Sequence, residues 1–190
     1  AVYMSGYCVA ASYGRPDIGL VSGSQMVERA GQIVLATKLP VLVDADTGYG
    51  GVSNIVEAVR AYEHVGAAGL HLEDQVSPKK CGAMAGKALV PDAEMAERLN
   101  AALKARGSSD FLIIGRTDAA SIFGIDEAVR RLKFMATLGV DAVMAPALSS
   151  LEDCKRAADA VDVPVLHTVT ETVRPVFSQA KRNPKRIVFA

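Results

Sequence analysis

The chain has 190 residues, of which 50% are hydrophobic and 22% are charged, and its formal net charge is zero because 21 basic residues match 21 acidic ones. This composition is typical of a globular protein, and the length predicts one domain over residues 1–190. A nucleic-acid surface or an anionic membrane surface would need a basic excess, and a membrane span would need roughly 20 apolar residues in a row, so neither partner is expected.

Three cysteines, Cys8, Cys81 and Cys154, are an odd number and lie far apart in the chain. That arithmetic predicts neither a disulfide framework nor a zinc site. A reducing cytoplasm is the simplest compartment for such a protein.

Seven apolar runs of strand length alternate with helical patterns of about 10 to 15 residues, which is typical of βα units on a parallel sheet. The runs are rich in Val, Leu and Ile, as expected for strands covered on both faces. Capping-box spacings of Asn54 with Glu57 and of Ser149 with Glu152 predict two helix starts. In chain order the expected strands are Ala1–Ser5, Pro40–Asp46, Gly69–Glu73, Phe111–Thr117, Ala142–Ala147, Val163–Val169 and Arg186–Ala190.

Two α/β architectures fit this order, a doubly wound open sheet and a closed (β/α)8 TIM barrel. The barrel is favoured because polar groups end several different strands rather than gathering at one switch point. A barrel normally takes about 250 residues, so we expect an incomplete barrel here, without its first βα unit and final helices. The chain also begins and ends on segments that read as buried strands, which predicts a piece of a longer polypeptide.

Carboxylates end two of the expected strands. Asp44 and Asp46 lie two residues apart, so on a strand both side chains point to the same face. Two acids at a barrel mouth repel each other unless a cation lies near them, and oxygen ligands suit Mg2+ or Mn2+. The alternative is a pair of aspartates that cap the following loop. Glu73 ends the next strand and adds a third carboxylate to the same edge.

Arg116 ends the strand after that, two residues before Asp118. Its guanidinium can bind a carboxylate or phosphate through two hydrogen bonds, which points to an anionic substrate. A structural ion pair with one of the neighbouring acids is the alternative. Of the histidines, His71 and His167 lie in expected strands and are predicted to be core residues, although His167 could reach the barrel mouth.

The segment after Glu73 contains Lys79, Lys80 and Cys81, with glycines that permit a mobile loop over the substrate. Adjacent ammonium groups favour a thiolate, so Cys81 is a candidate nucleophile or proton carrier. No histidine adjoins it in sequence, which disfavours a thiol–histidine nucleophile. Cys8 and Cys154 lack such neighbours and are expected to be packing residues.

Together these segments resemble the isocitrate lyase/phosphoenolpyruvate mutase superfamily, over essentially the whole chain and in order. The Lys-Lys-Cys-Gly segment is similar to that of the lyase branch, above all to 2-methylisocitrate lyase and 2,3-dimethylmalate lyase, while carboxyphosphonoenolpyruvate mutases share much of the pattern. The matching segments are Tyr3–Tyr7, Gly14–Gly19, Asp44–Gly50, Leu72–Gln75, Lys79–Gly82 and Arg116–Ala119.

The resemblance implies a Mg2+-dependent carbon–carbon lyase that cleaves a small 2-hydroxy di- or tricarboxylate through an enolate and releases a keto acid. By position, Asp44, Asp46 and Glu73 would bind the metal, mostly through water. Cys81 would protonate the carbanion, with Lys80 polarising its loop and Arg116 as the third catalytic residue. The substrate-binding residues implied are Tyr3, Ser5, Gly6, Tyr7, Asp17, Gly82, Arg116 and Thr168. The family also implies a homotetramer in the full-length form.

Three positions depart from the family pattern. Ala83, Pro146 and Thr168 stand where the lyases usually carry histidine, glutamate and asparagine. These positions belong to the part that holds the distal carboxylates of the substrate. Two further functions therefore stay open: carboxyphosphonoenolpyruvate phosphonomutase or oxaloacetate decarboxylase chemistry, and a non-catalytic protein that binds a keto acid.

Overall fold

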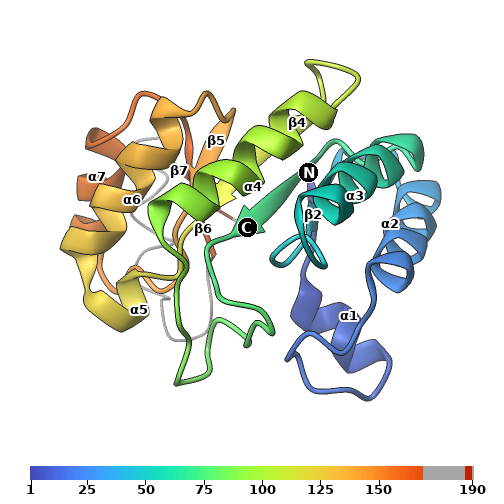
Figure 1. Cartoon of the computed structure of the whole chain (residues 1–190), viewed down its shortest axis with the longest axis horizontal. Coiled ribbons are helices and arrows are strands. Elements are labelled where there is room, and N and C mark those ends of the chain that lie inside the picture. The colour runs from blue at the N-terminus through green and yellow to red at the C-terminus, as the bar shows by residue number, and fades with distance from the viewer. Residues whose placement is uncertain (169–186, 190) are drawn as a thin grey trace.

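The computed structural model describes residues 1–168 and 187–189. Seven strands form one parallel sheet in sequence order. Each lies within or matches an expected run, and helices surround the sheet (Figure 1). This order confirms the prediction of an α/β fold of the TIM-barrel type, whereas one domain over all 190 residues stays a prediction. The strands are β1 (Val2–Met4), β2 (Val41–Asp44), β3 (Gly69–Glu73), β4 (Leu112–Arg116), β5 (Ala142–Met144), β6 (Val165–His167) and β7 (Ile187–Phe189).

One or two helices follow each strand from β1 to β5. Three of the connections differ from a single helix: β1 is followed by two helices, β3 by a long irregular segment before its helix, and β4 by a short helix that runs into a longer one. The helices are α1 (Gly6–Ser12), α2 (Gly23–Ala36), α3 (Val52–His64), α4 (Asp92–Ala105), α5 (Ala120–Phe123), α6 (Ile125–Thr137) and α7 (Leu151–Asp159).

Both predicted helix starts are wrong by a small shift. Helix α3 begins two residues before Asn54, whose side chain instead accepts the Gly51 N–H at 3.1 Å from within the first turn. Helix α7 is capped by Ser150 rather than Ser149, with the Ser150 hydroxyl accepting the Asp153 N–H at 3.0 Å. The residue with extended backbone before the first helical turn is Gly51 in α3 and Ser150 in α7, so each of these is the N-cap.

The core has two parts, because alternate strand residues face opposite sides of the sheet. The larger part lies between the sheet and the helices and includes Ile113 of β4. The smaller part lies inside the barrel and includes Ile114. Gly115 faces outward again, where an added Cβ would lie 3.0 Å from the Met135 sulfur and 3.2 Å from Leu99, so helices α4 and α6 pack directly on this strand.

No helix among the described residues is long and apolar enough to cross a membrane.

Candidate active site

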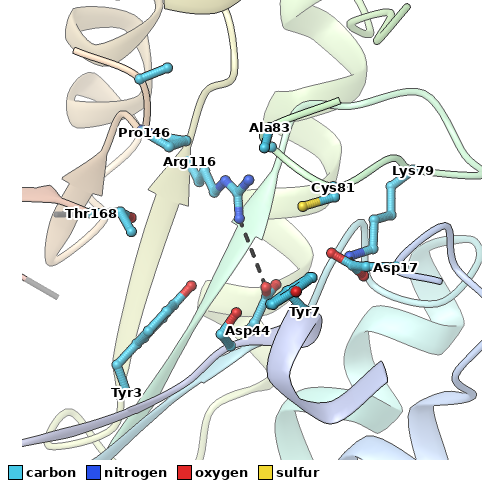
Figure 2. Close-up of a pocket in the computed structure, with 13 residues that line it drawn as sticks. Tyr3, Tyr7, Asp17, Asp44, Lys79, Cys81, Ala83, Arg116, Pro146 and Thr168 are labelled. Atoms are coloured by element: carbon cyan, nitrogen blue, oxygen red, sulfur yellow. Dashed lines mark hydrogen bonds and ion pairs between the residues drawn. The ribbon is translucent and has the colours of Figure 1, made fainter. Parts of the chain in front are cut away.

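Inward-facing side chains at the carboxyl ends of β1 to β4 gather around one cavity. Arg116 lies two residues after Ile114 and therefore faces the inside of the barrel at the end of β4. His71 and Glu73 share the inner face of β3 in the same way. The cavity has a volume of about 520 Å³ (Figure 2). It is lined by Tyr3, Ser5, Tyr7, Asp17, Asp44, Lys79, Cys81, Gly82, Ala83, Arg116, Pro146, Ala147 and Thr168.

Most of the predicted site residues are therefore brought together. Among the described residues, four predicted members do not line the cavity, namely Gly6, Asp46, Glu73 and Lys80. The first three lie directly behind the lining residues, as shown below. Lys80 points away, because its ammonium donates to the Gly86 carbonyl at 2.8 Å.

Arg116 is the central cation of the site. Its guanidinium contacts Asp118 through two nitrogens, at 3.1 and 3.3 Å, and lies 3.2 Å from Glu73 and 3.8 Å from Asp44. The residue is only 7% exposed. Burial disfavours the charged form, but these acids outweigh it and hold the pKa of Arg116 well above its usual value. Arg116 thus makes the structural ion pairs considered from the sequence and still faces the cavity.

Asp44 is a buried carboxylate with fixed hydrogen bonds. One oxygen accepts the Gly6 N–H and the other accepts the Asp46 N–H, both at 3.0 Å. Burial raises the pKa of Asp44, but His71, Arg116 and Lys79 lower it more, so its net pKa lies well below the usual range. Asp44 is therefore ionised throughout the physiological range.

Asp46 lies in a more negative environment. Burial, and then the charge of Asp44, raise the pKa of Asp46 to about 7, although the ammonium of Lys79 opposes the shift from 2.8 Å. Lys79 also forms an ion pair with Asp17. Burial lowers the pKa of Lys79, but Asp46 and Asp44 raise it more, so the net shift is upward and the ammonium stays charged.

Lys79 was not predicted as a site residue, although it lines the cavity and is 5% exposed. Figure 2 shows its side chain reaching Asp17 on the side of the cavity opposite Pro146. No periodic pattern in the loop could have separated it from the adjacent Lys80.

His71 was predicted to be a core residue, and it is buried, but it contacts the site. Its Nε2 lies 2.7 Å from the Tyr3 hydroxyl and 3.5 Å from Asp44. Burial lowers the pKa of His71 to about 4, with Asp44 opposing the shift, so the ring is neutral at pH 7. The signal available in the sequence was its spacing of two from Glu73. His167 is fully buried, with Nδ1 3.3 Å from the Ala145 carbonyl, and is not among the lining residues.

The segment between β3 and α4 crosses the cavity and carries Cys81. The Cys81 N–H donates to the Asp17 carbonyl at 2.9 Å, and Figure 2 shows the sulfur directed toward the Arg116 side of the cavity. Gln75 anchors the segment, since its side-chain amide makes two hydrogen bonds of 2.9 Å with the backbone of Lys80. Gly82 allows close approach, because an added Cβ would lie 3.2 Å from an Arg116 nitrogen.

The other two cysteines differ from each other. Cys154 is buried, as predicted for a packing residue, and burial raises the pKa of its thiol to about 11. Cys8 is exposed, so the prediction that it packs in the core is wrong. It lies in the first turn of α1, which turns that side chain outward.

The acids of the site fit a hard divalent cation. An added Cβ at Gly6 would lie 2.9 Å from Asp44 and 3.1 Å from Asp46, so the glycine leaves room for the backbone beside these carboxylates. The buried Oε1 atom of Glu73 has no hydrogen-bond partner among the described residues. Over the same residues, no three acidic, histidine or cysteine side chains converge on one point. Mg2+ needs only one or two direct carboxylates, because it keeps several waters.

The opposite wall of the cavity is built from small and apolar residues. Pro146, Ala147 and Thr168 line it, and Figure 2 shows Pro146 and Thr168 across the cavity from Asp17 and Lys79. Ala83 also lines the cavity, from the segment that carries Cys81. Each of the three departures from the family pattern therefore lies on the cavity surface.

Enzymes with a parallel α/β barrel take their catalytic residues from several βα loops. The acids, the arginine and the loop cysteine at the strand ends of this chain follow that pattern. The sequence matches the family described as phosphoenolpyruvate phosphomutase over residues 1–187. The chain belongs to this family, which confirms the resemblance drawn from its motifs.

Individual relatives are lyases and related enzymes. The 2-methylisocitrate lyase of Shewanella oneidensis is 42% identical over 172 residues, which are 90% of this chain and 59% of that protein. The 2,3-dimethylmalate lyase of Eubacterium barkeri is 42% identical over 183 residues, 95% of this chain and 63% of that protein. The chain thus spans less than two thirds of the length of either relative.

Solved structures share the fold. Oxaloacetate acetylhydrolase in complex with the inhibitor 3,3-difluorooxalacetate has a TM-score of 0.88 and 33% identity, covering 98% of this chain and 66% of that chain. Phosphonopyruvate hydrolase in complex with oxalate and Mg2+ has a TM-score of 0.81 and 27% identity, with coverages of 98% and 66%.

Proposed function

We propose that the full-length protein is a carbon–carbon lyase that uses Mg2+, or Mn2+ in its place, to cleave a small 2-hydroxy di- or tricarboxylate and release a 2-oxo acid. The observation that carries the proposal is that Cys81, Arg116 and Asp44 line one cavity. Family membership and the 42% identity to two lyases support the type of reaction.

Each group of residues at the cavity has a separate role in this reaction. Arg116, with a charge that its buried acids keep in place, binds a substrate carboxylate. The hydroxyls of Tyr3, Ser5 and Tyr7, all at the cavity surface, orient the same end of the substrate. Asp44, Asp46 and Glu73 would hold Mg2+, which when bound supplies electrostatic stabilisation of an enolate oxygen.

Cys81 donates the proton that completes the reaction. A carboxylate of the site accepts the 2-hydroxyl proton and the hydroxyl oxygen becomes a carbonyl oxygen. The adjacent carbon–carbon bond breaks at the same time, and its electron pair stays on the departing carbon. The thiol of Cys81 is directed toward the Arg116 side of the cavity, where the substrate binds, and protonates the carbanion. The covering segment keeps bulk water from competing for this step.

The apolar wall of the cavity favours a second function, which is decarboxylation of oxaloacetate. Ala83, Pro146 and Ala147 offer no charge to a distal carboxylate. A smaller substrate such as oxaloacetate fits this wall better than a tricarboxylate, and the solved oxaloacetate acetylhydrolase shares 33% identity with the chain. Phosphonomutase chemistry on the same enolate site is the other alternative.

A product screen tests these functions. The full-length protein with Mg2+ is offered 2-alkylmalates, citramalate and methylisocitrate, and 2-oxo acid release is followed. Oxaloacetate is offered separately, with pyruvate release measured above the background of Mg2+ alone, and phosphonates are followed by phosphorus NMR. No product from the 2-hydroxy acids would refute the lyase. Cleavage of oxaloacetate alone would select the second function, and calorimetric binding of keto acids without any turnover would identify a binding protein.

The role of Cys81 is tested by Cys81→Ser. We expect turnover to fall by about 100-fold to 10,000-fold, because the poorer acid must supply the proton, while Mg2+ binding is unchanged. Cys8→Ser is the matched control, since Cys8 is exposed and outside the cavity lining. Equal turnover of the two variants would remove Cys81 from the mechanism.

The cytoplasmic location and the homotetrameric assembly remain predictions. Light scattering on the full-length protein tests the second.

A further inference from the structure

Asp74 is a buried carboxylate that does not reach the cavity. It directly follows Glu73 and is 0% exposed. One oxygen accepts the Asp118 N–H at 3.0 Å, and the other accepts the Thr117 hydroxyl at 2.6 Å and an Arg131 nitrogen at 3.1 Å. Asp74 therefore ties the end of β3 to the residues that follow β4 and to helix α6.

Asp118 carries this connection to Arg116. Its carboxylate, 1% exposed, makes the two contacts of 3.1 and 3.3 Å with the guanidinium. The backbone N–H of Asp118 is held by Asp74, and the backbone N–H of Asp74 donates to the Arg116 carbonyl at 3.1 Å. A shift of Asp74 would therefore shift the residue that sets the direction of the Arg116 side chain.

Asp74 and Arg131 also hold the base of the segment that carries Cys81. Where the segment returns toward α4, the Val90 N–H donates to the Asp74 carbonyl at 2.8 Å, and the Val90 carbonyl accepts the Arg131 guanidinium at 3.0 Å. Where the segment leaves β3, Arg98 donates to the carbonyls on either side of Asp74, at 3.0 and 2.9 Å. Both ends of the segment thus meet at one buried point.

We propose that Asp74 and Arg131 are positioning residues that set Arg116 and the Cys81 segment relative to each other. The proposal rests on the proposed function, in which these two groups act on one substrate. Charge-assisted hydrogen bonds between buried groups fix geometry better than neutral ones, and a displacement of 1 Å at a reacting group can cost about 100-fold in rate.

The chain offers a matched pair of variants on α6. Arg131 and Arg130 are neighbours, and both bind Glu127. Arg131 adds the contact with Asp74, whereas Arg130 instead makes two hydrogen bonds with Asp92 at the surface. In the full-length protein we expect Asp74→Asn and Arg131→Gln to lower kcat/KM by about 10-fold to 100-fold. Arg131→Lys keeps the positive charge and should retain part of the kcat/KM that Arg131→Gln loses. Arg130→Gln should change kcat/KM by less than about twofold.

A second measurement does not need turnover. The Nε–H of Arg116 donates to Asp118, so its NMR signal should be distinct and slow to exchange with solvent. We expect Asp74→Asn and Arg131→Gln to shift this signal and speed its exchange, and Arg130→Gln to leave it unchanged. If Asp74→Asn does not fold, the two Arg131 variants test the same contact.

Two outcomes would overturn the proposal. One is a loss of thermal stability in Asp74→Asn and Arg131→Gln with kcat/KM and the Arg116 signal unchanged, which would make the contacts merely structural. The other is that Arg130→Gln changes kcat/KM and the Arg116 signal as much as Arg131→Gln does. Failure of the wild-type product screen would refute the proposed function, whereas the Arg116 signal would still show whether Asp74 positions that side chain.

Discussion

Replacement of Arg116 by glutamine should destabilise the protein strongly. The variant keeps a polar side chain of similar reach but leaves Glu73, Asp118 and Asp44 without their shared cation. At an effective dielectric constant of about 20, one charge pair at the 3.2 Å separation from Glu73 corresponds to about 5 kcal/mol of attraction. Buried pairs broken on one side cost about 3–5 kcal/mol, because an uncompensated charge remains.

The loss of stability caused by Arg116→Gln should be larger at neutral pH than at acidic pH. The pKa of Asp44 in the folded protein lies below its ordinary value of 3.8, so ionised Asp44 stabilises the fold above that pH, and this stabilisation is lost as the pH falls. Arg116 helps to lower that pKa, and it also opposes the upward shift that burial imposes on the pKa of Glu73. Without Arg116 the acids take up protons on folding, so the stability difference from wild type is largest near neutral pH and shrinks toward about pH 4.

Urea denaturation at neutral pH and at about pH 5 measures both effects, and thermal melting should show a drop of roughly 6–20 °C. Arg60→Gln is the control, because Arg60 is exposed on α3 and is not among the residues that line the cavity. A loss below about 1 kcal/mol, or one that grows as pH falls, would refute the view that Arg116 compensates these buried acids.

Two further substitutions separate residues that look alike in the sequence. Lys79→Met should weaken stability by about 3–5 kcal/mol by leaving Asp46 unpaired, whereas Lys80→Met should cost under about 1 kcal/mol, and equal urea midpoints would contradict the assigned orientations. Gly6→Ala should weaken Mg2+ binding, seen by calorimetry, because its Cβ would lie 2.9 Å from Asp44 and displace that carboxylate; unchanged affinity would remove Asp44 from the metal site.

The sequence predicted the strands well because buried parallel strands carry a strong local signal. Every residue of β3 is buried, and its expected bounds match the observed ones. Strand geometry also made the inward position of Glu73 predictable, since residues two apart on a strand share a face. The same argument was wrong for Asp46, because β2 ends at Asp44 and Asp46 lies in a turn with a φ of 48°. The same rule would have found His71, two residues before Glu73 and paired in register with Asp44.

The loop residues were not predictable on that basis. Lys79 and Lys80 adjoin Cys81 equally, and no periodicity assigns their directions. The direction is set by Gln75, whose two hydrogen bonds to the Lys80 backbone turn the chain so that Lys79 enters the acid cluster. Ser149 and Ser150 show the same difficulty at a helix start, where one residue of difference in backbone angles decides which serine caps.

The zero net charge of the chain conceals a local imbalance that bears on the proposed metal. Four buried carboxylates and the partly buried one of Asp17 face three cations in this region, and if all were ionised two negative charges would remain. Such an excess is costly in a buried site, which is why the pKa of Asp46 rises to about 7. A bound Mg2+ would carry the charge that balances this excess, which supports the proposal of a divalent rather than a monovalent ion. The residues of the cluster are Asp17, Asp44, Asp46, Glu73 and Asp118 with Lys79, Lys87 and Arg116.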